Sequence, residues 1–157
     1  MSSEFSEVTK KKLEKVIARY PQKNAALLPV LHLVQQEVGY ISSTEEDQIA
    51  ALLDLKPIHV REVVTFYTMY NRQPVGKYYI QVCSNLSCSL LGAQTLVDYL
   101  KEKLGIELGE TTEDKKFTLT TVECLGACEQ APCMMVNYDY YGDLDKNRID
   151  EILDHLE

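Results

Sequence analysis

The sequence lacks any hydrophobic run long enough to span a membrane. A membrane-spanning helix needs about 18–20 consecutive apolar residues, whereas the most apolar segment, Ala25 to Val34, is short and contains Pro29 and His32. The first residues, Met1 to Phe5, also lack the basic start and apolar stretch of a secretory signal and the arginines of a transit peptide. These absences predict a chain that does not insert into a bilayer and that resides in the cytoplasm.

Positive charge is scarce, because 16 Lys and Arg stand against 24 Asp and Glu, for a formal net charge of −8. Affinity for nucleic acids comes mainly from Lys and Arg that release counterions from the phosphates. Residues 44–70 resemble a helix-turn-helix reader, but the candidate recognition helix, Ile58 to Tyr70, has Arg61 as its only fixed positive charge. The sequence therefore predicts protein partners and no nucleic acid.

The sequence also lacks C-x-x-C motifs and glycine-rich nucleotide-binding loops. The chain has 5 cysteines, an odd number, and none of them forms a C-x-x-C motif. In a reducing cytoplasm this argues against a disulfide framework and against a thioredoxin-type redox pair, and it favours metal binding. Because no G-x-G-x-x-G or Walker-type glycine loop is present, and no Ser–His–Asp or Cys–His nucleophile arrangement is evident, we expect no dinucleotide site and no catalytic residue on this chain.

A turn-rich stretch, residues 71–76, separates two kinds of pattern. Before it, apolar residues at helical spacing predict four short helices; Gly39 ends the second, a capping box of Ser43 and Glu46 opens the third, and Pro57 opens the fourth. After it, the order β-α-β-β-β-α predicts a small α/β sandwich. Its strands are expected at Lys77 to Val82, Phe117 to Val122, Cys133 to Val136 and Tyr140 to Leu144, and its helices at Cys88 to Leu104, with Leu91 on the buried face, and at Ile149 to Leu156. We therefore predict a helical bundle over residues 1–72 and an α/β domain over residues 73–157.

Four of the cysteines stand at the ends of two predicted strands. Cys83 and Cys88 flank the loop after the first strand, and Cys124 and Cys128 flank the loop after the second. If these strands are neighbours in the sheet, their loops lie side by side and four thiolates converge on one point. Four thiolates are the ligands that a [2Fe–2S] cluster needs. Gly126 supports this prediction, since glycine lets the backbone approach sulfur closely.

Other interpretations of the cysteines stay open at this point. A structural zinc ion also accepts four cysteines, although its sites usually have tighter C-x-x-C spacing, and it would make the chain a zinc-stabilised interaction module. Buried cysteines without a metal are a further alternative. Cys133 opens an apolar strand and is expected to be a core thiol, with a fifth, substitute ligand as its alternative.

The motifs resemble a known family, the thioredoxin-like [2Fe–2S] subunits in the NADH-dehydrogenase module of respiratory complex I, the NADH:quinone oxidoreductase. The stretches that carry the resemblance are Cys83-Ser-Asn-Leu-Ser-Cys88, Val122-Glu-Cys-Leu-Gly-Ala-Cys128 and Ala131-Pro132. The family's ligand pattern, C-x4-C followed by C-x3-C, implies one [2Fe–2S] cluster on Cys83, Cys88, Cys124 and Cys128, with Cys133 outside. The implied fold is a thioredoxin-like [2Fe–2S] ferredoxin domain preceded by an N-terminal helical bundle.

The resemblance also implies a partner and a role. In that family the cluster exchanges single electrons with the FMN of a larger flavoprotein subunit, which carries both FMN and the NADH site. The helical bundle is then expected to grip this flavoprotein, with packing on its own α/β domain alone as the alternative. Other peripheral-arm subunits are expected to complete the assembly, and the chain is expected to lie on the cytoplasmic side of the inner membrane as a peripheral part of the complex. Similar subunits serve in diaphorase modules of NAD-linked hydrogenases and formate dehydrogenases, so the resemblance leaves that alternative open.

Overall fold

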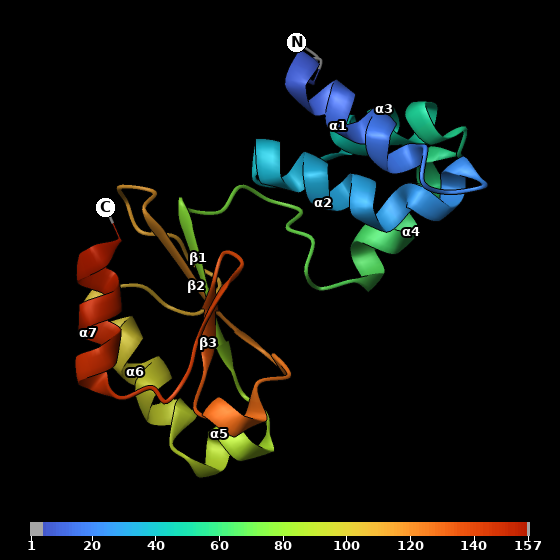
Figure 1. The fold of residues 1–157 in the computed structure, drawn as a ribbon. Helices are drawn as coiled ribbons and strands as arrows, with labels where there is room; N and C mark the ends of the chain where they lie inside the picture. Colours follow the sequence, from blue (N-terminus) through green and yellow to red (C-terminus); the bar gives the residue numbers. More distant parts are fainter. Residues whose placement is uncertain (1–4, 157) are drawn as a thin grey trace. The chain divides into compact units, whose positions relative to one another are not determined.

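The computed structural model describes residues 5–156, and the chain divides into two compact units between Pro74 and Val75. We call residues 5–74 the helical unit and residues 75–156 the α/β unit, and we describe each by itself (Figure 1). In the part of the chain that the structure describes, no helix is both long enough and apolar enough to cross a membrane.

The helical unit contains the four helices that the apolar spacing predicts. They are α1 (Glu7–Ile17), α2 (Leu27–Val38), α3 (Ser43–Leu53) and α4 (Pro57–Phe66), with a short 3-10 helix, η1 (Lys23–Ala26), before α2. Gly39 ends α2 with a φ of 89°, a conformation that glycine adopts without strain, and Pro57 opens α4, both as predicted. Residues from all four helices form one apolar core, among them Leu13, Val30, Leu31, Ile49 and Val60.

The capping box of α3 differs by one residue from the prediction. Ser42, not Ser43, is the N-cap, and its backbone N–H donates a 2.9 Å hydrogen bond to the Glu45 carboxylate. Glu46 is instead buried at 3% exposure and forms an ion pair with Arg61 of α4, with 2.8 Å between Oε2 and Nη2. Because each serine stands three residues before a glutamate, the sequence pattern fits both registers, and the tertiary ion pair selects one of them.

A buried glutamine ties the segment after α4 to α2. Gln35 donates from Nε2 to the carbonyl oxygen of Met69 at 2.9 Å, and its Oε1 accepts from the backbone N–H of Asn71 at 2.6 Å. The Tyr70 hydroxyl donates to the carbonyl oxygen of Leu28 at 3.0 Å. The two bonds of Gln35 satisfy backbone groups that no helix or strand pairs, and together with the Tyr70 bond they fix the end of the helical unit.

The α/β unit is built on one mixed sheet. Its strands are β1 (Tyr78–Cys83), β2 (Phe117–Val122), β3 (Met134–Val136) and β4 (Asp139–Tyr141), in the order β2-β1-β3-β4. β1 and β2 are parallel neighbours, as the prediction of converging loops requires, and β3 is antiparallel to both β1 and β4. The last strand ends at Tyr141 rather than Leu144, because Asp143 has a left-handed φ of 51° and its N–H bonds to the carbonyl of Gln130 at 2.8 Å.

Two long helices cover one face of this sheet (Figure 1). α6 (Ala93–Leu104) and α7 (Lys146–His155) pack on alternate strand residues, and the shared core includes Ile80, Val82, Leu100, Leu119 and Ile149. The prediction of one continuous helix from residue 88 to 104 is wrong. A separate helix, α5 (Leu86–Leu90), ends before Gly92, whose φ of 91° breaks the helical path, and Leu91 is 61% exposed instead of buried.

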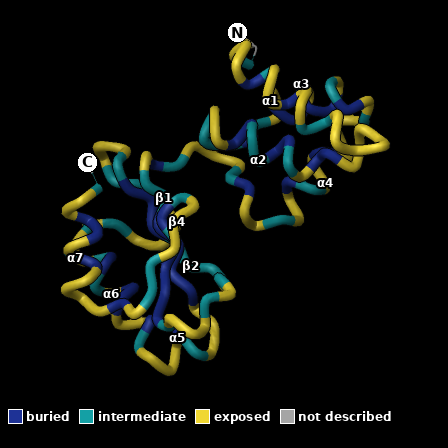
Figure 2. Tube along the Cα trace, viewed as in Figure 1, coloured by how far each residue is buried: buried dark blue, intermediate teal, exposed yellow. Residues whose placement is uncertain are grey.

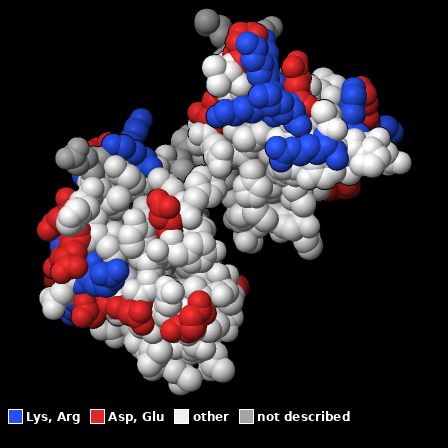
Figure 3. Space-filling view, in the orientation of Figure 1, with Lys and Arg blue, Asp and Glu red and all other residues white. Residues whose placement is uncertain are grey.

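The first cysteine loop and α5 form a largely exposed surface without charged residues. Figure 2 shows buried strands in the middle of the unit and an exposed trace over much of α5. Residues 83–97 include no Asp, Glu, Lys or Arg, and Figure 3 shows uncharged atoms at this end, while acidic side chains gather on the side where α7 lies. The first cysteine loop therefore lies in a neutral, partly apolar surface.

Candidate metal centre

Both cysteine loops leave the same edge of the sheet. β1 ends at Cys83 and β2 ends at Val122, and these two residues are register partners in the parallel ladder. Ser84 continues the contact, since its N–H and its hydroxyl both donate to the carbonyl of Val122, at 2.9 and 3.0 Å. The chain therefore enters the two loops from adjacent positions, as parallel pairing dictates.

The first loop turns at once into α5. The side chain of Asn85 accepts a 2.7 Å hydrogen bond from the N–H of Leu86 and caps this short helix, and the Ser89 hydroxyl donates to the carbonyl of Ser84 at 2.8 Å. Cys88 lies within α5 with 2% of its surface exposed, and Cys83 is equally buried. The tight turn thus folds the Cys88 sulfur back toward the end of β1.

The second loop lies at the surface. Cys124 and Cys128 are exposed, and Gly126 between them has a φ of 73°, in the left-handed region that favours glycine. This conformation lets the Gly126 N–H donate to the Cys124 sulfur at 3.3 Å. The loop also reaches the first one, because the backbone N–H of Leu125 donates to the sulfur of Cys83.

The structure brings together three sulfurs, and one of them was not predicted as a ligand. The sulfur atoms of Cys83, Cys88 and Cys133 lie within 4.8 Å of one another, and those of Cys88 and Cys133 are 3.8 Å apart. The sulfurs of Cys124 and Cys128 lie outside this group. Cys133 is 1% exposed, which fits its interpretation as a core thiol, yet it borders the metal-binding candidates directly.

A non-local contact places Cys133 there. Its carbonyl accepts a 3.1 Å hydrogen bond from the N–H of Cys83, just beyond the antiparallel pairing of β3 with β1. The peptide bond between Ala131 and Pro132, immediately before it, is cis. Knowledge of the antiparallel register between β1 and β3 would have placed Cys133 beside Cys83. The spacing of the cysteines along the sequence does not contain that register.

The three buried thiols differ in their acidity. Burial by itself raises the pKa of Cys83, but the hydrogen bonds from the N–H groups of Asn85 and Leu125, together with those from the neighbouring thiols, bring that pKa below its usual value. Burial raises the pKa of Cys88, and it raises the pKa of Cys133 to about 12. Cys83 is therefore the thiol most readily ionised in this group.

The donor set suits a thiolate-bound iron–sulfur cluster. Five thiols and several backbone N–H donors gather at one end of the α/β unit, and clusters of this kind are held by cysteine thiolates and tuned by hydrogen bonds to sulfur. Cys83 and Cys88 provide a buried pair, and Cys124 and Cys128 provide an exposed pair on the adjoining loop. The residues present therefore fit the predicted [2Fe–2S] group.

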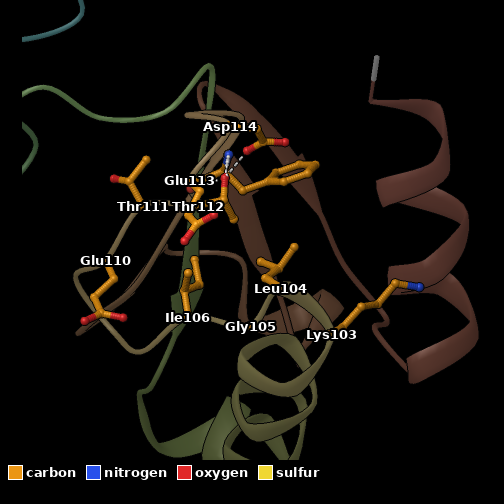
Figure 4. Close-up of a pocket in the computed structure, with 10 residues that line it drawn as sticks. Lys103, Leu104, Gly105, Ile106, Glu110, Thr111, Thr112, Glu113 and Asp114 are labelled. Carbon is orange, nitrogen blue, oxygen red and sulfur yellow. Dashed lines mark hydrogen bonds between the residues drawn. The ribbon is translucent and has the colours of Figure 1, made fainter.

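A hollow lies at the opposite end of β2 from the cysteines (Figure 4). It measures about 850 Å³ and is lined by the end of α6 and by residues 110–114. Its polar groups bond within the turn, where the Phe117 N–H donates to the Thr112 hydroxyl at 3.0 Å and the Lys116 N–H donates to Asp114 at 2.9 Å. The same segment pairs with the outer edge of β2 through an isolated bridge between Thr111 and Thr118. These bonds are structural, and the cysteine end remains the candidate site.

Comparison with known proteins points to the same chemistry. Residues 13–157 match the family model described as thioredoxin-like [2Fe-2S] ferredoxin. An E-type subunit of NADH-quinone oxidoreductase from Rhizobium meliloti (strain 1021) is 43% identical over 145 residues, which cover 92% of this chain and 86% of that protein. The E-type subunit of NADH-quinone oxidoreductase from Rickettsia conorii (strain ATCC VR-613 / Malish 7) is 44% identical over 147 residues, covering 92% of this chain and 88% of that protein.

More distant matches extend the likeness. The mitochondrial NADH dehydrogenase [ubiquinone] flavoprotein 2 of Dictyostelium discoideum is 41% identical over 157 residues, which cover 98% of this chain and 64% of that protein. Among solved structures, an NAD+-reducing [NiFe]-hydrogenase in the air-oxidized state superposes with a TM-score of 0.72 at 22% identity. That match covers 83% of this chain and 22% of the hydrogenase chain, and it shows a shared fold.

Proposed function

Because the chain belongs to the thioredoxin-like [2Fe–2S] ferredoxin family, we propose that it is the electron-transfer subunit of an NADH:quinone oxidoreductase. Family membership confirms the predicted fold class and the predicted [2Fe–2S] cofactor. The two bacterial relatives named as subunits of NADH-quinone oxidoreductase, at 43 and 44% identity over most of both chains, support the choice of complex. The observation that carries the proposal is that the two cysteine loops leave parallel neighbouring strands at one sheet edge.

We propose Cys83, Cys88, Cys124 and Cys128 as the four ligands. Cys83 and Cys88 are supported by their burial and by their shared sulfur group. Cys124 and Cys128 are supported by their position on the loop whose Leu125 N–H reaches the Cys83 sulfur. Cys133 is left outside this set, because the two loops already provide two thiols each.

When bound, the cluster supplies one-electron transfer, and the chain's own residues set the conditions for it. The N–H groups of Asn85 and Leu125 donate to the Cys83 sulfur, and that of Gly126 donates to Cys124. Such bonds favour the more negative, reduced state of a cluster. Burial of Cys83 and Cys88 excludes water on one side, while the exposed second loop opens the site to a partner on the other.

The proposed partner is a flavoprotein subunit that binds FMN and NADH, with other peripheral-arm subunits around it. In this proposal NADH and FMN bind on the partner and not on this chain, and the assembly lies at the inner membrane without any insertion by this chain. The helical unit is proposed to grip the flavoprotein. Phe66 at 77% exposure and Met69 at 42% exposure support a contact there, since exposed aromatic and Met side chains are typical of interfaces. An equivalent role in a hydrogenase or formate dehydrogenase module is a weaker proposal, because the hydrogenase likeness is one of fold.

The cluster assignment is tested on anaerobically purified protein. We expect about two irons and two sulfides per chain, and an S = 1/2 electron paramagnetic resonance signal after dithionite reduction. Single Ala variants of the four ligands should lose most of the cluster, whereas Cys133→Ala should retain it. A folded protein that, after removal of any bound zinc, takes up no cluster from iron and sulfide and binds only about one zinc ion per chain would replace the proposal with a zinc-stabilised interaction module.

The partner is tested by co-purification of the tagged chain with its flavoprotein. Bound FMN and NADH-oxidising activity should be found only in fractions that contain the flavoprotein. The isolated chain should bind neither FMN nor NADH. Measurable binding of NADH or FMN to the isolated chain would contradict this part of the proposal.

A further inference from the structure

Cys133 gives the cysteine end a feature that a four-ligand cluster does not explain. Its sulfur is buried, lies 3.8 Å from that of Cys88, and shares with Cys83 and Cys88 a group in which the sulfurs are within 4.8 Å of one another. All three thiols are free, and the structure contains no disulfide among them. A thiol that only fills core volume has no need to face two other sulfurs.

The spacing matches that of thiolates on a single metal ion. With a metal–sulfur bond of about 2.3 Å, two thiolates at corners of a tetrahedron lie about 3.8 Å apart. The observed separation between the Cys88 and Cys133 sulfurs is 3.8 Å, and Cys83 closes the triangle. One edge of a tetrahedral thiolate site is therefore in place without the second loop, and the Cys83 sulfur lies near its third corner.

We propose that the apoprotein binds one thiophilic divalent ion of the zinc class through Cys83, Cys88 and Cys133, and that this ion excludes the [2Fe–2S] cluster. The exclusion follows because the two sites share Cys83 and Cys88; in this respect the inference rests on the proposed function. Each thiol that becomes a ligand releases its proton to solvent, and no electron is transferred. The fourth tetrahedral position is completed by water or by a thiol of the second loop.

The surroundings favour a soft ion at this position. The first cysteine loop and α5 have no Asp or Glu between residues 83 and 97, and the nearest carboxylates in the sequence of the second loop, Glu123 and Glu129, are exposed. A 3.1 Å hydrogen bond from the Cys83 N–H to the Cys133 carbonyl also holds these two residues side by side. The sulfurs of Cys88 and Cys133 both lie within 4.8 Å of the Cys83 sulfur.

The first test is titration of the full-length apoprotein with Co2+, followed by displacement with Zn2+. Sulfur-to-cobalt charge-transfer absorption counts the thiolates, and the wild-type protein should bind one ion with at least three. Cys133→Val, with Cys133→Ser as a second variant, should lower the number of bound thiolates by one and raise the dissociation constant for Co2+ at least about tenfold. Loss of a residue that only hydrogen-bonds to a metal ligand already weakens metal binding by about that factor, and loss of the ligand itself should weaken it at least as much. Far-ultraviolet circular dichroism verifies the fold of each variant.

A matched control separates the two sites. The double variant Cys124→Ala, Cys128→Ala should keep tight Co2+ binding yet form no [2Fe–2S] cluster, whereas Cys133→Val should form the cluster normally. Zinc loaded before reconstitution should slow cluster formation in the wild type and slow it much less in Cys133→Val.

Two results would overturn the inference. One is a Co2+ affinity and thiolate count in both Cys133 variants equal to those of the wild type. The other is loss of Co2+ binding in the double variant at Cys124 and Cys128, which would assign the ion to the four predicted cluster ligands. Failure of the wild-type protein to form a cluster would count against the proposed function alone, because the Co2+ titration needs no cluster.

Discussion

At the scale of single residues, Gly126 shows how backbone conformation prepares the cysteine end. Its φ of 73° is cheap for glycine and costs other residues about 1–2 kcal/mol, and a Cβ added there would meet no atom within 4 Å. The cost of a substitution is therefore conformational and not steric. The same conformation aims its N–H at the Cys124 sulfur, 3.3 Å away.

We predict that Gly126→Ala lowers the free energy of unfolding by about 1 kcal/mol and reduces the iron content after reconstitution. Gly126→Asn is the matched control, because asparagine tolerates the left-handed region better than alanine does. Urea unfolding followed by circular dichroism and iron analysis measure the two effects. An alanine variant as stable as the wild type, with full iron content, would show that the loop has no need of this conformation.

His32 on α2 gives the helical unit a pH dependence. Burial lowers its pKa below the ordinary value of 6.5, and its ring packs against that of Tyr70 with 5.3 Å between centroids. As the pH falls through about 6.5, the unfolded chain gains a proton that the folded chain does not yet accept. His32 should therefore leave the free energy of unfolding unchanged above that pH and should lower it as the pH falls further.

We predict that His32→Gln flattens this decrease between about pH 7 and the lower pKa of the folded state. Urea unfolding of the apoprotein across that range measures it, since loss of a cluster then makes no contribution. Equal pH slopes for the variant and the wild type would assign the dependence to other groups.

The residue scale also shows where the sequence sufficed and where it did not. Cys83, Cys88, Cys124 and Cys128 could be predicted as ligands because strand ends and turn residues are local signals, and this ligand set stays a prediction. The position of Cys133 beside Cys88 depends on the pairing of β3 with β1, between residues about fifty apart in sequence. No local pattern encodes that register.

At the scale of helices and strands, Gln35 connects α2 with the segment after α4. It is 6% exposed and bonds both to the carbonyl of Met69 and to the N–H of Asn71. The neighbouring Gln36 is exposed on the same helix. Substitution of Gln36 is therefore a matched control for substitution of Gln35.

We predict that Gln35→Leu lowers the free energy of unfolding by about 1–3 kcal/mol, because it leaves two partly buried backbone groups unpaired. Gln36→Leu should change it by less than about 0.5 kcal/mol, as is usual for surface positions. Denaturant unfolding of both variants makes the comparison. Equal effects would mean that water replaces the lost bonds at residues 69–71.

Periodicity predicted the elements better than their ends. Helical spacing runs unbroken through Leu91 and Gly92, so the pattern suggested one helix where the structure has α5 and α6. Glycine is tolerated inside helices as well as at their ends, and only the backbone shows that Gly92 has a φ of 91°. The strand from Phe117 to Val122 was predicted with the bounds that the structure shows, because alternation and turns agree there.

At the scale of the whole molecule, each unit has its own apolar core. The cluster around Leu31 and Ile49 belongs to the helical unit, and the cluster around Ile80 and Leu119 belongs to the α/β unit. The proposed boundary after residue 72 lies two residues before the division of the described fold at Pro74. Its meaning as a boundary between functional domains stays a prediction.

We predict that a shortened chain of residues 75–157 folds and binds the cluster with the same reduced spectrum as the intact chain, because all five cysteines and one complete core lie within it. It should lose most of its affinity for the flavoprotein. Circular dichroism, electron paramagnetic resonance and co-purification measure these properties against the full chain. A shortened chain that does not fold would contradict the predicted domain division.

The segment beside the hollow of Figure 4 has a further consequence for the molecule in solution. Residues 109–112 occupy the outer backbone groups of β2: the Gly109 N–H bonds to the carbonyl of Leu119 at 2.7 Å, and the Thr112 N–H bonds to that of Phe117 at 2.9 Å. An open strand edge is a template on which another chain can add a strand and begin to aggregate. With that half of β2 capped, and with β4 at the other edge only 3 residues long, the sheet offers little template for intermolecular strand addition, even at high protein concentration.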